Sequence, residues 1–496
     1  MNGDLPDLPD TWQWSHVSKF GFVKGGKRLP KGELLVEEKT GHPYLRIRDL
    51  KDGTVDRSQI LYVPSHVFPE IQNYTIQHGD VYLTIVGSIG EAGTIPADFD
   101  GASLTENAAK IVQPVGLIPE FLAAWFRSPL CQRVIQQNIH SGGQGKLALF
   151  RIELMPVPLA PLAEQQRIVA KLEKLLGQVD ACRQRLDKIP TLLKRFRQSV
   201  LAAACSGHLT EDWREGSKSD DTAGEFLSEI QHNRIQRETV ATGKAATVKV
   251  YVFDPEDASS LPIIPDTWTW CSVSACADVR DGTHDSPKYH EVGVPLVTSK
   301  NLLPSGIDFT NVNLISHGDY EAIAKRSAVC DGDILFAMIG TIGNATIVNG
   351  GHPFAIKNVG LFRTFGSLVL SNYLRFWLNS PAAALFFRDH AKGSSQPFAP
   401  LNLLRALPFP LPPRTECEEI VRRVESLFAL ADNIEHRYKK AQTFIDKLTS
   451  SLLAKAFRGE LVPQDPKDEP ASVLLERIKA EREKENKVRK KGSRRH

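Results

Sequence analysis

The sequence predicts an α+β protein with two pseudo-symmetric globular domains that are separated by long helices, and we expect these helices to form an antiparallel coiled coil. Two observations predict this. The chain of 496 residues repeats itself over almost its whole length, so that GDVYLTIVGSIG at 79–90 is answered by GDILFAMIGTIG at 332–343. In each copy, a part with short β-rich runs is followed by a part with heptad spacing. A tandem duplication of one two-part unit explains both patterns.

The first part of each copy is predicted to be a compact α+β domain. The copies open with LPDTWQWSHVSKF at 8–20 and IPDTWTWCSVSAC at 264–276. β-Rich runs such as YLRIRDL and PLVTSKNL then alternate with glycine, proline and asparagine, and one helical run follows, such as WFRSPLCQRVIQQ. This pattern is typical of a mixed domain, which we place at residues 8–160 and 264–412.

The second part of each copy has apolar residues that step by alternating threes and fours, in the same register in both copies. This spacing predicts a coiled-coil seam, and two copies in one chain can pair with each other. The alternative is that each stripe packs only on its own globular domain. Pro190 predicts a kink or break in the first helical stretch. The main predicted seam residues are Leu172, Leu175, Val179, Leu186, Leu193, Phe196, Val424, Leu427, Ile434, Tyr438, Ile445 and Leu448, and Cys182 falls in the same stripe.

These assignments divide the chain into six segments. Helical spacers are expected at residues 161–206 and 413–458, a helical and linker segment at 207–263, and a helical segment with a basic tail at 459–496. The tail ends in KVRKKGSRRH, which has no acidic residue, and we expect it to be disordered with weak affinity for phosphates. Paired spacers would hold the two globular domains at a fixed separation about a pseudo-twofold axis.

Composition narrows the class of protein. Hydrophobic residues make up 42% and charged residues 24%, as in a core-forming protein, and the net charge is only +3. Any affinity for nucleic acid must therefore come from local arrangement. The seven cysteines are scattered without a C-x-x-C pair, which argues against a disulfide framework and a zinc ribbon. No signal peptide or membrane-spanning stretch is apparent, so we expect a cytoplasmic protein.

Known catalytic signatures are absent or incomplete. GFVKGGKR at 21–28 has the spacing of a phosphate loop, but Arg28 stands where Ser or Thr must bind magnesium. Pro9-Asp10 together with Glu37-Glu38-Lys39 suggests a nuclease carboxylate cluster only superficially, because the second copy keeps Pro265-Asp266 but has no matching Glu-x-Lys. We find no spacing of histidines or cysteines typical of a metal site. The sequence therefore predicts a protein that binds and does not catalyse, with no metal of its own.

The polar residues between the β-rich runs are the candidate contacts to double-stranded DNA. Arg and Lys can neutralise phosphates or bind guanine, and Asn and Gln can pair with adenine. The scaffold repeats closely while these residues differ between copies, as recognition of two different half-sites would need. The alternative for each single residue is an ordinary solvated side chain. The candidates are Lys24, Lys27, Arg28, Arg46, Arg48, Asn107, Lys110, Gln144 and Lys146 in the first copy, and Arg280, Thr283, His284, Lys288, Lys300, Asn301, Lys357, Asn358, Ser394, Ser395 and Gln396 in the second.

Along nearly its full length the sequence resembles the specificity subunit of Type I restriction-modification enzymes, particularly the enterobacterial type IA branch. The resemblance lies in DGTHDSPKYHEVGVPLVTSKNL and GDILFAMIGTIGNATIV of the second domain, and in helical stretches such as PLAEQQRIVAKLEKLLGQVD and LTSSLLAKAFRGEL. The first domain departs from the pattern, because it has GFVKGGKRLPKG where the second has a GTH motif.

The resemblance implies a subunit without catalytic activity whose two target-recognition domains each read one half of a split DNA target. It also implies an antiparallel helical spacer that docks two methyltransferase subunits, with motor-endonuclease subunits joining the complex. S-adenosylmethionine, ATP and magnesium would then be bound by those partners. From the residues alone, a fused nuclease or modification enzyme and a coiled-coil architectural protein remain the alternatives.

Overall fold

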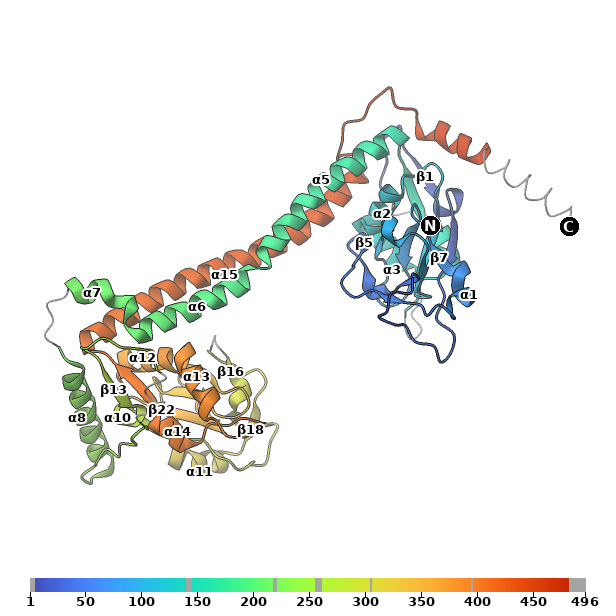
Figure 1. Cartoon of the computed structure of the whole chain (residues 1–496). Helices are drawn as coiled ribbons and strands as arrows, with labels where there is room; N and C mark the ends of the chain where they lie inside the picture. The colour runs from blue at the N-terminus through green and yellow to red at the C-terminus, as the bar shows by residue number, and fades with distance from the viewer. Residues whose placement is uncertain are drawn as a thin grey trace. The chain divides into compact units, whose positions relative to one another are not determined.

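The computed structural model describes residues 5–139, 145–216, 221–254, 261–303, 306–393 and 396–480. The chain forms two compact units (Figure 1). Unit 1 contains Met1–Asp187 and Lys439–His496, and unit 2 contains Lys188–Tyr438. Each unit thus combines one globular part with part of the helical spacer. The predicted boundaries of the six segments stay predictions.

Unit 1 contains a mixed α+β domain. Its central sheet is antiparallel with the order β2-β11-β8-β9, and a second sheet has the order β6-β3-β10-β7, in which β3 and β10 run parallel. Helix α2 (Pro119–Arg127) packs on the central sheet and is followed by α3 (Pro129–Gln137). The strands are β1 (Gln13–His16), β2 (Phe22–Gly25), β3 (Pro43–Leu45), β4 (Leu50–Lys51), β5 (Thr54–Val55), β6 (Leu61–Tyr62), β7 (Thr75–Ile76), β8 (Val81–Thr84), β9 (Ala92–Thr94), β10 (Ala102–Leu104), β11 (Ala108–Val112) and β12 (Pro156–Leu159). Strand β1 pairs with β12, and β4 pairs with β5.

Unit 2 repeats this plan, which confirms the duplicated fold. Its central sheet has the matching order β14-β22-β19-β20, and β13 pairs with β23 as β1 pairs with β12. One difference is helix α11 (His317–Ser327), since unit 1 has only the short α1 (Phe68–Ile71) after its corresponding strand. The strands are β13 (Thr269–Ser272), β14 (Asp278–Asp281), β15 (Val294–Val297), β16 (Leu302–Leu303), β17 (Gly306–Ile307), β18 (Asn313–Ile315), β19 (Ile334–Ala337), β20 (Gly343–Ile347), β21 (Ala355–Ile356), β22 (Val359–Arg363) and β23 (Pro408–Leu411). The main domain helices besides α11 are α12 (Leu368–Leu378), α13 (Pro381–His390) and α14 (Leu401–Ala406).

The twelve-residue sequence repeat forms the first strand and the turn of two matching hairpins, β8-β9 in unit 1 and β19-β20 in unit 2. Gly87 and Gly340 open the two turns with φ of 75° and 78°, a region that favours glycine. Buried Asp80 and Asp333 accept hydrogen bonds from backbone N–H groups of the turn before each strand. The repeated glycines thus follow from the positive φ angle of the turn, and the repeated aspartates from the buried carboxylate that accepts backbone hydrogen bonds.

Three long helices follow the domains: α5 (Leu162–Leu186), α6 (Ile189–Ser206) and α15 (Arg414–Ala456). The predicted break near Pro190 is confirmed, because α5 ends at Leu186 and α6 begins at Ile189. Pro190 then occupies the first turn of α6, where its missing N–H removes no helical hydrogen bond.

The helices pair antiparallel within each unit. In unit 1, Leu172 of α5 shares a buried cluster with Leu453 of α15, and Arg183 contacts Asp446 at 3.3 Å. In unit 2, Arg197 of α6 contacts Asp432 of α15 at 2.6 Å. Partner numbers on α15 fall as numbers on α5 and α6 rise, as antiparallel pairing requires. The regular knobs-into-holes packing of a coiled coil stays a prediction.

The predicted seam residues are unequally covered. Leu172, Val179, Leu193, Val424 and Ile445 are buried. Ile434 is 39% exposed and Cys182 is exposed, so the prediction of a buried seam position is corrected for both. A pair of helices covers each side chain from one side only, which leaves residues at the edge of the stripe open to water. The half-buried members are Leu175, Leu186, Phe196, Leu427, Tyr438 and Leu448.

A buried Trp–Glu hydrogen bond connects the domain to a long helix in each unit. Trp12 Nε1 donates to Glu164 Oε2 at 2.9 Å, and Trp268 Nε1 donates to Glu416 Oε2 at 2.8 Å. The remaining partners differ: Gln464 donates to Glu164, whereas Glu416 receives Thr210 and the guanidinium of Arg214. Burial raises the pKa of Glu164. The duplicated PDTW sequence is thus explained by the same Trp–Glu hydrogen bond in both units.

We expect Glu416→Ala to destabilise unit 2 by roughly 3 kcal/mol, because it leaves the Trp268 N–H and the largely buried Arg214 charge without their acceptor. Thermal unfolding followed by circular dichroism measures the effect. Glu418→Ala is the matched control, since the Arg414–Glu418 pair is about half exposed on each side and should contribute less than about 1 kcal/mol. Equal melting temperatures for the two variants would contradict the assigned role.

Candidate DNA interface

The turn after β14 in unit 2 is built on a glycine. Gly282 N donates to Val359 O at 2.9 Å, and Thr283 N donates to Ile356 O at 3.0 Å. A Cβ atom at Gly282 would lie 2.2 Å from Ile356 O, so no other residue fits without moving the backbone. This close approach places Thr283 and His284 beside the segment that connects β21 to β22.

A buried carboxylate organises the polar side chains at this turn. Asp281 is 4% exposed, and its Oδ2 lies 3.0 Å from His284 Nε2. Its Oδ1 accepts a hydrogen bond from Arg326 of α11. His284 Nδ1 lies 2.9 Å from the side-chain oxygen of Asn358, which has φ of 55°. Because opposite charge and several partners hold these groups, they are oriented before any ligand arrives.

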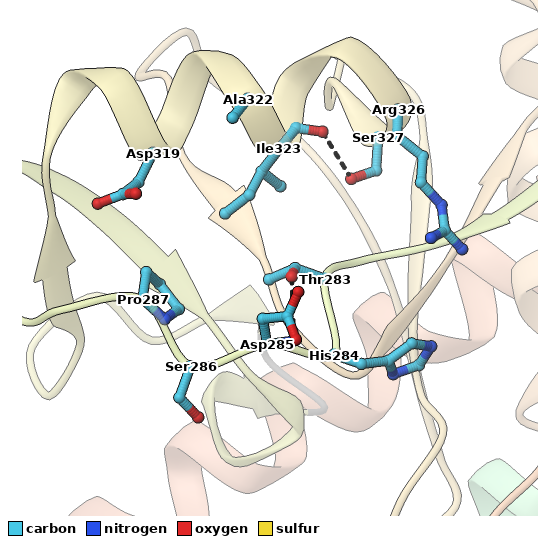
Figure 2. Close-up of a pocket in the computed structure, with 10 residues that line it drawn as sticks. All are labelled: Thr283, His284, Asp285, Ser286, Pro287, Asp319, Ala322, Ile323, Arg326 and Ser327. Atoms are coloured by element: carbon cyan, nitrogen blue, oxygen red, sulfur yellow. Dashed lines mark hydrogen bonds between the residues drawn. The ribbon is translucent and has the colours of Figure 1, made fainter.

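A pocket of about 400 Å³ separates this turn from α11 (Figure 2). The loop from Thr283 to Pro287 forms one side and α11 forms the other. Lys357 donates to Ser286 in the same loop. Arg280 donates to Asp278 at 2.6 Å and to the backbone oxygen of Arg326 at 3.1 Å. The structure therefore brings the predicted residues Arg280, Thr283, His284, Lys357 and Asn358 together.

Unit 1 has the corresponding turn with different side chains. Gly26 N donates to Ala108 O at 3.1 Å, and a Cβ atom there would lie 2.1 Å from Thr105 O. Gly26-Lys27-Arg28 thus occupies the place of Gly282-Thr283-His284. Lys27 and Arg28 are exposed.

The partners of the unit 1 turn also differ from those in unit 2. Arg28 Nε donates to Glu106 Oε1 at 2.7 Å, and Lys27 Nζ lies 5.3 Å from the centroid of the Tyr74 ring. The Tyr44 hydroxyl stabilises the turn by donating a hydrogen bond to Lys27 O at 2.9 Å. Burial raises the pKa of Tyr44 to about 12, so its hydroxyl remains a donor.

Three predicted residues hold the fold together. Lys110 is buried and contacts Asp80 at 3.4 Å. Arg46 is the first residue of a capping box that Asp49 closes. In the matching box of unit 2, Thr298 is the first residue and Asn301 is the residue that closes it. Because the polar atoms of Lys110 and Asn301 are used inside the domains, we withdraw these two from the proposed contact set as a correction.

The remaining predicted residues are spread over both domains. Arg48 and Lys300 are exposed and occupy matching positions in the two capped turns. Asn107 is half-buried just before β11. Gln144, Ser394 and Ser395 lie outside the described residues. The other exposed candidates are Lys24, Lys146, Lys288 and Gln396.

Sequence reasoning missed Asp281, Arg326 and Glu106. Asp281 directly precedes the GTH motif, which is a signal that could have indicated it. Arg326 is 45 residues away from Asp281 along the chain, so no motif spacing connects them. Glu106 lies next to the predicted Asn107 and was overlooked because an acid was not expected in a DNA interface.

Other kinds of site are not supported by the described part of the chain. There, no group of three or more His, Cys, Asp or Glu side chains is arranged to hold a metal ion. The same residues contain no helix that is both long and apolar enough to cross a bilayer.

Comparison with known sequences points to one family. Residues 9–191 match the family described as the Type I restriction modification DNA specificity domain. The sequence is 30% identical to the Type I restriction enzyme EcoBI specificity subunit of Escherichia coli, with 97% of this chain and 94% of that protein covered. It is 27% identical to the EcoKI specificity subunit of Escherichia coli strain K12, with 96% of each covered.

Solved structures support the fold. A chain from a study of complex assembly and conformational transition in the type I R-M system superposes with a TM-score of 0.63 at 17% identity, covering 92% of this chain and all of that one. The HsdS subunit from Thermoanaerobacter tengcongensis gives a TM-score of 0.50 at 17% identity and covers 93% of this chain and 100% of its own length. At these identities the likeness concerns the fold.

Proposed function

This chain belongs to the family of Type I restriction enzyme specificity subunits, and from that premise we propose that its two domains each read one half of a split DNA target. Its role is to select the sequence, and chemistry on the DNA belongs to partner subunits. Family membership favours this function over the two alternatives, a fused nuclease or modification enzyme and an architectural coiled coil.

One observation carries the proposal of two different half-sites. The same glycine turn presents Lys27 and Arg28 in unit 1 and Thr283 and His284 in unit 2, on strands of matching order. Bases are distinguished by the donors and acceptors that a protein offers to their edges. Equal scaffolds with unequal side chains therefore suit two unequal half-sites. The exposed cations Arg48 and Lys300, at matching positions, suit phosphate contacts that position each domain.

The proposed partners follow from the same premise. Two methyltransferase subunits would dock on the paired helices, and motor-endonuclease subunits would join the complex. S-adenosylmethionine, ATP and magnesium would be bound by these partners, and the assembly would act in the cytoplasm. The basic tail at 487–496, which lies outside the described residues, would add weak affinity for DNA of any sequence.

The direct test is methylation mapping in cells that express this chain with its methyltransferase subunit. We expect one bipartite motif with two fixed parts and a gap of constant length. Methylation without a sequence motif, or a motif that persists when this chain is omitted, would refute the proposed function.

We expect the double substitution of Thr283 and His284 by alanine to relax one part of the motif by roughly tenfold, because base contacts act locally. The matched variant with Lys27 and Arg28 replaced by alanine should relax the other part instead. Selection of bound DNA from a random library measures both. Loss of affinity for all sequences with the motif unchanged would identify these side chains as phosphate contacts.

A further inference from the structure

Arg326 at the end of α11 is oriented by the protein but only partly used by it. Its side chain is 61% exposed, and its one side-chain partner among the described residues is Asp281. A guanidinium has five N–H donors in a planar fork, so most of them remain available. The position in the last turn of the helix also favours a cation, because the helix dipole is negative there.

Arg326 and His284 form one surface because they share an acceptor. Asp281 holds His284 through one oxygen and Arg326 through the other. Figure 2 shows Arg326 reaching from α11 towards the end of the pocket at which His284 lies. The backbone under Arg326 is fixed as well, since Arg280 donates to its carbonyl oxygen at 3.1 Å. Because the arginine is already ordered by these contacts, it loses less conformational entropy when it binds a ligand.

We propose that Arg326 is a specificity-determining residue of unit 2 that reads a guanine, and that Asp281 is the residue that positions both Arg326 and His284. This inference rests on the proposed function. Guanine presents two acceptors, N7 and O6, in the major groove, and an arginine fork with free N–H groups matches them. At the corresponding place unit 1 has only the short α1, which ends at Ile71, so we assign this reader to the half-site of unit 2.

The test uses the complete complex with its methyltransferase subunits and a random DNA library. Arg326→Gln removes the charge, and Arg326→Lys keeps the charge but loses the planar fork. We expect both to lower the preference for guanine at one position of the half-site, by about tenfold for Arg326→Gln and by several-fold for Arg326→Lys. Lys325→Gln, an exposed neighbour on the same helix, should leave the motif unchanged.

The positioning role of Asp281 has its own readout. Asp281→Asn keeps the shape and removes the charge that holds the two readers. We expect it to relax the guanine position and the position that depends on His284 together, with affinity for nonspecific DNA unchanged. Glu321→Gln, an exposed acid of α11 that does not line the pocket, is the control and should change neither.

The possible outcomes separate the explanations. If Arg326→Lys binds DNA as the wild type does and Arg326→Gln lowers the affinity for every DNA sequence equally, Arg326 contacts a phosphate and the inference is wrong. If neither variant changes the motif, Arg326 only anchors α11 and the inference is also wrong. If the wild-type complex selects no motif at all, the proposed function itself fails. Melting temperatures of the variants show whether a loss reflects unfolding, and Arg326→Lys keeps the test valid if Arg326→Gln does not fold.

Discussion

Replacing Val179 and Ile445 together by aspartate should abolish recruitment of the methyltransferase subunit and with it all methylation. Both side chains are buried in unit 1, Val179 on α5 and Ile445 on α15. The substitutions would place two charges of the same sign at buried positions on the paired helices, which should cost more than about 4 kcal/mol. Copurification of tagged methyltransferase with this chain measures the effect.

The choice of these two positions depends on the structure. Ile434 belongs to the same heptad stripe, but its exposure means that an aspartate there would remain partly in water. Exposed positions on the same helices provide the control, and Gln178→Asp with Gln442→Asp should leave copurification intact. Normal methylation by the variant with Val179 and Ile445 replaced would show that the helix pair is not needed for assembly.

The duplicated elements of the fold, namely the hairpins and the long helices, could be predicted from the sequence. Backbone geometry requires glycine at positions such as Gly87 and Gly340, so the repeated letters indicated the repeated hairpin. The heptad register indicated the helices, and Pro190 indicated where the first helical stretch ends. These signals are local, because each depends on the chain within a few residues of itself.

The candidate site was harder to predict because one residue type has several uses. Lys110 looks like a phosphate contact in the sequence, yet it neutralises buried Asp80. Asn301 looks like a base reader, yet it caps a turn. Arg326 was missed because α11 is much longer than α1, its counterpart in the other copy, and because its partner Asp281 is distant in sequence. Burial and partnership across the fold decide these roles, and no local pattern contains that information.

The same helices lead to a prediction about the gap between the two half-sites. Inserting one heptad after Leu186 and another after Tyr438 adds about 10 Å to each helix and keeps the apolar stripe in register. Because α5 and α6 pair antiparallel with α15, both insertions are needed, and a single insertion should bulge and impair folding. We expect the double variant to keep both half-sites and to prefer a longer gap.

The size of that change is bounded by DNA geometry. An added 10 Å corresponds to about three base pairs at 3.4 Å each, and any tilt of the helices relative to the duplex makes the increase smaller. The longer gap also rotates one half-site around the helix axis of the DNA, so the two half-sites no longer present the faces that the domains bind, and affinity should fall. Methylation mapping in cells reads the gap directly. An active double variant with the original gap would show that other parts of the complex set the distance, and a gap that lengthens would identify the helix pair as the element that measures it.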